Sequence, residues 1–168
     1  SEGFVALSHL VARQADTLRW SESQILTMVV KRFFTNSRLR QLLAVDMGRL
    51  EASEDYRREC FYKIFPPRVH RGENQSPTLR WICNRTCDGN NVVTPRDIID
   101  LLTKARQRQH DELTADPSGA SEFVIGASAL QYGFSELSEK KRDVYLHAEF
   151  PHLWPHIERF QGGKSSYS

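Results

Sequence analysis

The chain has 168 residues, of which 39% are hydrophobic and 26% are charged, and its formal net charge is +2. A chain of this length buries roughly 70% of the surface that its unfolded form exposes, so it can build its own core. The composition excludes a collagen, a wholly disordered chain and a disulfide scaffold. The near balance of charge excludes a global electrostatic pull on nucleic acid or acidic lipid.

The apolar runs, the N-terminal residues and the cysteines indicate the cellular compartment that we expect. No apolar run approaches the roughly 18 residues that a membrane helix needs, so we expect no membrane partner. Ser1 to Phe4 include no initiator methionine and no basic signal-peptide start, and we expect a piece of a longer protein. Three cysteines, Cys60, Cys83 and Cys87, without a secretion signal predict a reduced, cytoplasmic protein.

The first strong helix signal begins at Ser21, an N-cap residue with Gln24 three positions on, which is the spacing of a capping box. The apolar residues that follow have helical spacing: Ile25, Leu26, Val29, Val30, Phe33 and Phe34. Asn36 and Ser37 are expected to end this helix. A short second helix is expected over residues 38–43.

Ser53 is expected to cap a further helix over residues 54–65. Pro66 ends it, because the residue before a proline is disfavoured in the α region. The polar stretch 68–77 contains Gly72 and is interpreted as a loop. The residues from Pro77 to Ile82 are predicted to start another short helix, and the composition of 88–91 is typical of a turn.

The clearest helix start in the chain is Thr94-Pro95-Arg96-Asp97. Thr94 can act as N-cap, Pro95 suits the first helical position, and Asp97 lies in the first turn near the positive end of the helix dipole. Apolar residues continue the pattern, so we expect this helix to reach about Gln109.

Residues 116–121 are the best linker candidate, since they combine Asp, Pro, Ser and Gly. They divide the chain into a helical bundle over 1–115 and a C-terminal helical unit with a flexible tail over 116–168. In the second unit, the β-prone run 123–125 is either a short strand or a helix lead-in. Helices are expected after Ser128, after Ser138 and over 151–160. The predicted fold class is all-α (mainly): a helical bundle followed by a smaller helical or winged-helix-like unit.

Metal-binding patterns are incomplete in this sequence. Cys83 and Cys87 form a C-x3-C pair, but no second pair completes a zinc set, so we interpret them as small buried hydrophobic residues. His147 and the i, i+4 pair His152 and His156 lack the glutamate of an H-E-x-x-H motif and are interpreted as surface histidines.

A partial phosphate-loop pattern is rejected. Gly162-Gly163-Lys164-Ser165 ends like such a loop, but Glu158 stands where the motif needs glycine, and no strand–helix context surrounds it. We therefore expect no metal site and no nucleotide-hydrolysis motif in this chain.

Arg96 stands in the first turn of its predicted helix, where backbone N–H groups lack intrahelical partners and favour an anion. The alternative is a solvated arginine that pairs with Asp97 or Asp100. The same two interpretations apply to Arg85. A second cationic group can meet phosphates or form a solvated face: Lys104, Arg106 and Arg108.

Three stretches resemble a known family when they are taken in order. They are Trp20-Ser21-Glu22 leading into Lys31-Arg32-Phe33, then Thr78 to Leu102 with its Thr94-Pro95-Arg96-Asp97 helix start, then Ser138 to Pro151. Over about residues 18–160 they resemble the region C-terminal to the nucleotide core in bacterial P-loop ATPases of the AAA-like and STAND-like kind. The Thr-Pro-Arg-Asp helix is the most specific part.

The resemblance implies a regulatory lid followed by a winged-helix-like or helical C-terminal element. It implies that Arg96 senses the γ-phosphate of ATP and that Arg85 is a supporting cation. The phosphate loop and the acidic Mg²⁺-binding strand would lie before Ser1. ATP and Mg²⁺ would therefore bind through the N-terminal P-loop core of the parent protein, which is the implied partner, and this chain would not itself be catalytic.

Two other function classes stay open. One is a helical or winged-helix module that binds DNA through Lys104, Arg106 and Arg108. The other is a structural protein–protein domain that packs through exposed aromatic residues such as Trp154 and Phe160. A free-standing enzyme ranks last, because the sequence has no recognisable nucleophile–base pair or ligand set.

Overall fold

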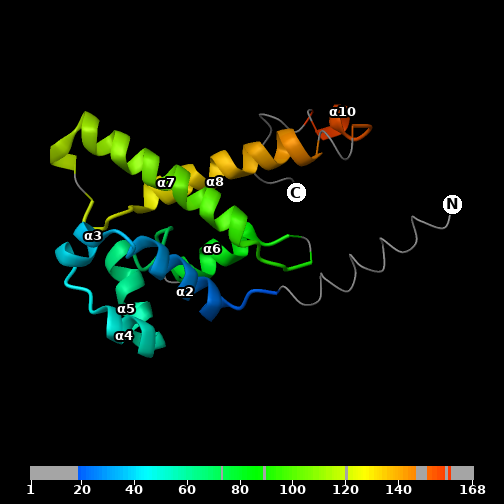
Figure 1. Ribbon diagram of the computed structural model, residues 1–168. Helices are drawn as coiled ribbons and strands as arrows, with labels where there is room; N and C mark the ends of the chain where they lie inside the picture. The colour runs from blue at the N-terminus through cyan, green and yellow to red at the C-terminus, as the bar shows by residue number, and fades with distance from the viewer. Residues whose placement is uncertain are drawn as a thin grey trace.

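The computed structural model describes residues 19–72, 74–88, 90–119, 121–146, 151–157 and 159. This part of the chain is mainly α-helical, as the sequence predicts, and contains no β-strand (Figure 1). Two isolated antiparallel bridges, between Arg68 and Pro77 and between Cys87 and Val93, close loops. The run 123–125 is a bent lead-in to a helix. The winged-helix character of the C-terminal part remains a prediction.

Helix α2, Glu22–Phe33, begins with the predicted capping box. The backbone N–H of Gln24 donates to Ser21 Oγ over 3.2 Å, and the backbone N–H of Ser21 donates to Gln24 Oε1 over 2.8 Å. Asn36 caps the next helix rather than only ending the first one. Its side chain accepts from two backbone N–H groups at the start of α3, Ser37–Leu42.

Helix α4, Met47–Ala52, is absent from the sequence expectations. It is a short helix capped by the Asp46 side chain, which accepts from the Arg49 backbone over 3.1 Å. Helix α5, Glu54–Ile64, follows directly, with the predicted Ser53 cap and the predicted end before Pro66.

Helix α6, Thr78–Thr86, begins directly after Pro77, as predicted. Helix α7, Pro95–Ala115, begins as predicted but reaches six residues beyond Gln109. A 3₁₀ turn, η1 at Pro117–Gly119, then leads toward helix α8, Ala127–Lys141.

The expectation of separate helices capped by Ser128 and Ser138 is wrong. Helix α8 has Gly126 as its N-cap, and it continues through Ser138. The Ser138 hydroxyl donates to the Phe134 carbonyl one turn earlier over 2.9 Å, so its hydroxyl is satisfied inside the helix. A π-helical turn, η2 at Arg142–Leu146, follows, and the short α10 spans Trp154–Ile157. The predicted tail from Gly162 lies outside the described residues.

Helices α7 and α8 are antiparallel neighbours, as Figure 1 and the contacts along them show. They approach closely at Gly133. A Cβ atom on Gly133 would lie 2.5 Å from the carbonyl oxygen of Leu101 and 3.1 Å from Cβ of Ala105. Only glycine therefore fits at this crossing.

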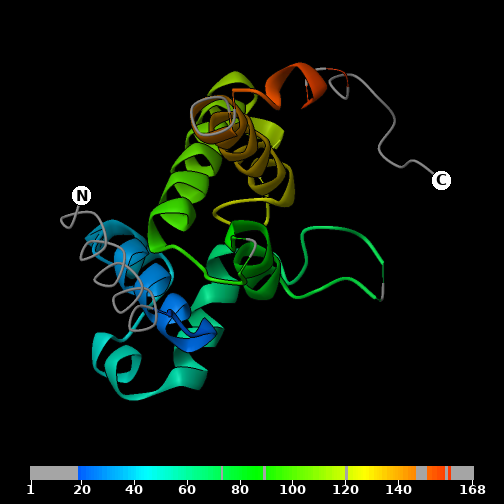
Figure 2. The same ribbon diagram turned by 90° about the vertical axis from the view of Figure 1, so that its right-hand side faces the viewer.

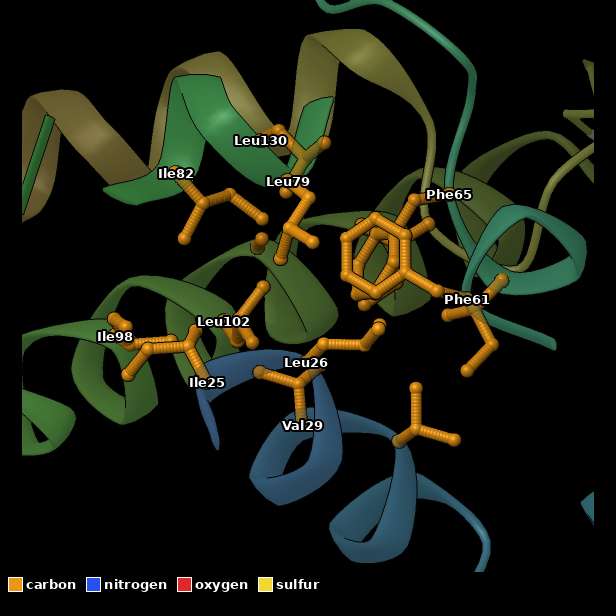
Figure 3. Packing of buried hydrophobic residues seen from close by; sticks show 14 of the residues in the cluster. Ile25, Leu26, Val29, Phe61, Phe65, Leu79, Ile82, Ile98, Leu102 and Leu130 are labelled. Atoms are coloured by element: carbon orange, nitrogen blue, oxygen red, sulfur yellow. The ribbon is translucent and has the colours of Figure 1, made fainter. Parts of the chain in front are cut away.

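One hydrophobic core joins residues from both predicted units. Figure 3 shows Leu26 of α2, Phe61 of α5, Ile82 of α6, Leu102 of α7 and Leu130 of α8 converging on it. Whether the chain divides near residue 116 into independently folding units remains a prediction, but both sides of that position contribute to the same core.

Candidate functional site

The N-terminus of α7 carries the most specific sequence motif. Thr94 does not cap the helix through its side chain: its hydroxyl donates to Asp97 Oδ2 over 2.6 Å. Pro95 occupies the first turn. Arg96 follows it, is exposed, and forms no ion pair within the described residues. An unengaged guanidinium therefore lies beside a helix end that has no side-chain cap.

The carboxylates next to Arg96 have other partners. Lys141 Nζ lies 2.6 Å from Asp97 Oδ2, and Lys140 Nζ lies 2.7 Å from Asp100 Oδ2. Both lysines come from the end of α8. The alternative in which Arg96 pairs with Asp97 or Asp100 is therefore not the arrangement in this structure. The end of α8 neutralises the acidic groups and leaves the Arg96 charge available.

Arg85, in the last turn of α6, is already engaged. Its guanidinium carbon lies 5.2 Å from the centroid of the Phe134 ring of α8, within the range of a cation–π contact. Phe134 in turn packs edge-on against Trp81, with ring centroids 5.8 Å apart. The structure thus gives Arg85 a packing role between α6 and α8, beside any contact that it makes with a ligand.

The three cations of α7 do not share one face. Residues two apart on a helix point about 200° apart, whereas residues four apart share a face. Lys104 lies 3.6 Å from Glu136 of α8, and Arg108 lies 5.2 Å from the Tyr132 ring of α8. Arg108 also pairs with Glu112 over 2.7 Å. Only Arg106 is exposed with no ion pair in the described part of the chain.

All three cysteines are free thiols. Cys60 and Cys83 are buried, and burial raises the pKa of Cys83 to about 11. The partly exposed Cys87 donates through its sulfur to the carbonyl of Asn84 over 3.1 Å. No group of three His, Cys, Asp or Glu side chains placed to hold a metal occurs among the described residues.

The histidines and aromatic residues of the C-terminal part are only partly described. His152 and His156 are exposed, and His147 lies outside the described residues. Trp154 is half-buried and Phe160 also lies outside the described residues, so the protein–protein surface that they suggest stays a prediction.

A hollow between α5 and the loop after it was missed by the sequence interpretation. Figure 2 shows this loop extending away from the helices at the right of the view. The residues that line the hollow are Tyr62, Pro67, Arg68, His70, Arg71, Gly72 and Pro77. The sequence signal was the placement of three basic or imidazole side chains between Pro67 and Pro77. That Tyr62 lines the same hollow follows only from the fold.

Comparisons with protein-family models, with curated proteins and with solved structures find no match to this chain. In the described ranges, none of the helices has both the length and the apolar character needed to cross a membrane. The described part of the chain is all-α, and its function has to be argued from the residues themselves.

Proposed function

We propose that this chain is the regulatory lid and C-terminal element of a P-loop ATPase, in which Arg96 contacts the nucleotide that the preceding core binds. The observation that carries the proposal is the state of Arg96. It lies in the first turn of α7, is exposed, and has no ion-pair partner among the described residues, while both neighbouring carboxylates are held by lysines.

The chemistry of this position suits a phosphate. A guanidinium presents several N–H donors in a fixed planar arrangement that matches phosphate oxygens. The uncapped N-terminus of α7 adds the positive end of the helix dipole. The ATP-bound Mg²⁺ would be held by the core, so this chain would supply a sensor and no catalytic base.

The packing of α7 on α8 supports a lid that moves as one unit. Gly133 permits close approach, and the two lysine–aspartate pairs tie the sensing end of α7 to the end of α8. A displacement of Arg96 on nucleotide hydrolysis would therefore carry α8 with it. Arg85, which contacts Phe134 of α8, would follow the same movement.

The test has two steps. The complete reading frame must encode a G-x-x-x-x-G-K-[S/T] phosphate loop before Ser1, and its absence refutes the proposal. In the complete protein, Arg96→Ala should lower ATP turnover by roughly 10²- to 10³-fold, as expected for loss of one transition-state donor, without lowering the melting temperature. Arg106→Ala, an exposed arginine of the same helix, is the matched control and should retain turnover.

Separate measurement of kcat and kcat/KM tests whether Arg96 acts on the transferred phosphoryl group. If Arg96 acts on the transferred phosphoryl group, Arg96→Ala lowers kcat and kcat/KM together. Arg96→Lys should recover only part of the loss, because an ammonium cannot reproduce the planar donor geometry. Unchanged turnover in Arg96→Ala would remove this residue from the mechanism.

A further inference from the structure

We infer that the hollow between α5 and the loop 66–77 binds single-stranded nucleic acid, with the Tyr62 ring as a stacking platform and Arg68 and Arg71 as phosphate contacts. This surface is separate from the cations of α7, and the inference does not depend on the proposed ATPase role.

The loop is held at its base, so it presents its side chains in a defined place. Its two ends are joined by a bridge between Arg68 and Pro77. Thr78 donates to the carbonyls of Pro67 and Pro66 over 3.0 and 2.5 Å. These contacts join the start of α6 to the end of the α5 segment and close the loop.

The middle of the loop is anchored to α8. Val69 is buried at 4% exposure, and its carbonyl accepts a hydrogen bond from Gln131 Nε2 over 3.1 Å. His70 lies beside the same amide, with its Nδ1 3.4 Å away, and its ring meets Trp81 edge-on at 6.0 Å between centroids. The anchors turn Val69 inward and leave its neighbours in the loop exposed.

Two of the exposed side chains of the loop are arginines, Arg68 and Arg71. Arg68 donates to the Gly72 carbonyl over 3.4 Å, and neither Arg68 nor Arg71 forms an ion pair within the described ranges. Glu73 contributes the loop's one carboxylate in the sequence and lies outside the described residues. By contrast, Arg58 and Arg80 on the neighbouring helices both pair with Glu22, over 3.7 and 3.5 Å. Within the described residues, Arg68 and Arg71 thus differ from Arg58 and Arg80 in having no ion pair, and both line the hollow.

The lining of the hollow also includes an aromatic ring and two prolines. Tyr62 is half-buried and packs edge-on against Phe61, with centroids 5.3 Å apart. Pro67 and Pro77 line the same hollow. A ring beside unpaired guanidinium groups is the combination that binds single strands: bases stack on the ring while cations follow the backbone. An acidic peptide would use the charges but not the ring, and a duplex keeps its bases stacked inside.

The test is fluorescence anisotropy of a labelled oligothymidylate titrated with the full 168-residue chain. Binding should weaken with salt, with a log–log slope of about −1.4 for two phosphates neutralised on a single strand. Arg68→Ala combined with Arg71→Ala should weaken binding by about tenfold or more and bring the slope toward zero. The matched control removes two charges from α7, Lys104→Ala with Arg106→Ala, and should bind as the unmodified chain does.

The stacking contact is tested separately. Tyr62→Leu keeps an apolar side chain but removes the ring, and it should weaken binding roughly 5- to 150-fold, the range of one base–aromatic contact. Tyr62→Phe should bind normally. Circular dichroism checks that each variant is folded. If Tyr62→Leu does not fold, the inference is tested by the double variant Arg68→Ala, Arg71→Ala.

Several outcomes would overturn the inference. They are no binding by the unmodified chain, an equal loss in the α7 control, or equal affinity for a DNA duplex or for polyglutamate. A loss confined to the α7 control would instead assign nucleic acid to Lys104 and Arg106.

Discussion

Gln109, deep in the contact between α7 and α8, accepts a hydrogen bond from the backbone N–H of Gly126 through its Oε1, over 2.7 Å. Gln109 is 5% exposed, and Gly126 is the N-cap of α8. The side chain thus satisfies a buried donor at the point where the chain turns back from α7. This contact ties Gly126, the last residue of the connecting segment, back to the body of α7.

Replacement of Gln109 by methionine keeps the volume and removes the acceptor. The buried N–H of Gly126 then loses its partner, which we expect to cost about 1–3 kcal/mol of unfolding free energy. Urea denaturation followed by circular dichroism measures it. Gln107→Met, on the exposed side of the same helix, is the control and should change the stability by less than about 0.5 kcal/mol. Equal losses in both variants would contradict the structural role of Gln109.

Gly133→Ala should also destabilise the chain. The new methyl group would lie 2.5 Å from the Leu101 carbonyl oxygen, a backbone atom that cannot move aside without separating α7 from α8. Alanine normally stabilises a helix relative to glycine, so a loss has to come from the overpacked crossing, which we expect to cost about 1–3 kcal/mol. Thermal unfolding compares it with Ser135→Ala on the exposed face of α8. A stabilised Gly133→Ala variant would show that α7 and α8 leave room for a methyl group at this crossing, and would contradict the prediction.

The pair Asp97–Lys141 should couple more strongly than an ordinary surface pair. The Asp97 side chain is 15% exposed, whereas Glu59 in the pair Lys63–Glu59 is 56% exposed. Double-mutant cycles with Asp97→Asn and Lys141→Met should give a coupling near the upper end of about 0.2–1 kcal/mol, and the Lys63–Glu59 cycle should give one near the lower end. The coupling should shrink as salt is added. Equal coupling energies in the two cycles would contradict the lower exposure of Asp97.

The cysteines should react with iodoacetamide in a fixed order. Burial raises the pKa of Cys83 to about 11, so near pH 8 only about one molecule in a thousand carries the reactive thiolate there. Peptide mass spectrometry should find the partly exposed Cys87 modified first, and Cys83 and Cys60 only in urea. Simultaneous labelling in the folded chain would contradict this.

The raised pKa of Cys83 also links stability to pH. Because the folded state favours the neutral thiol, the contribution of Cys83 is complete below its ordinary pKa of 9.0 and is lost as the pH rises toward 11. Cys83→Ser, which does not titrate in this range, should unfold with a flatter pH dependence above pH 9.0.

Part of the candidate site was readable from the sequence. Arg96 could be found because Pro95 beside it marks a helix start, and the structure begins α7 there. The partners of the neighbouring carboxylates could not be found, since Lys140 and Lys141 lie about forty residues away along the chain. The same holds for Tyr62, which meets the loop cations only in the folded chain.

The sequence by itself determined where helices begin when a side chain signals it locally. Ser21 with Gln24 and Ser53 before α5 cap through hydrogen bonds to residues at most three positions away, so a few letters contain the whole interaction. Only the tertiary structure decided where helices continue. Ser138 stays inside α8 because Leu130 and Leu137 on that helix are buried in the core, and that burial outweighs a local capping preference.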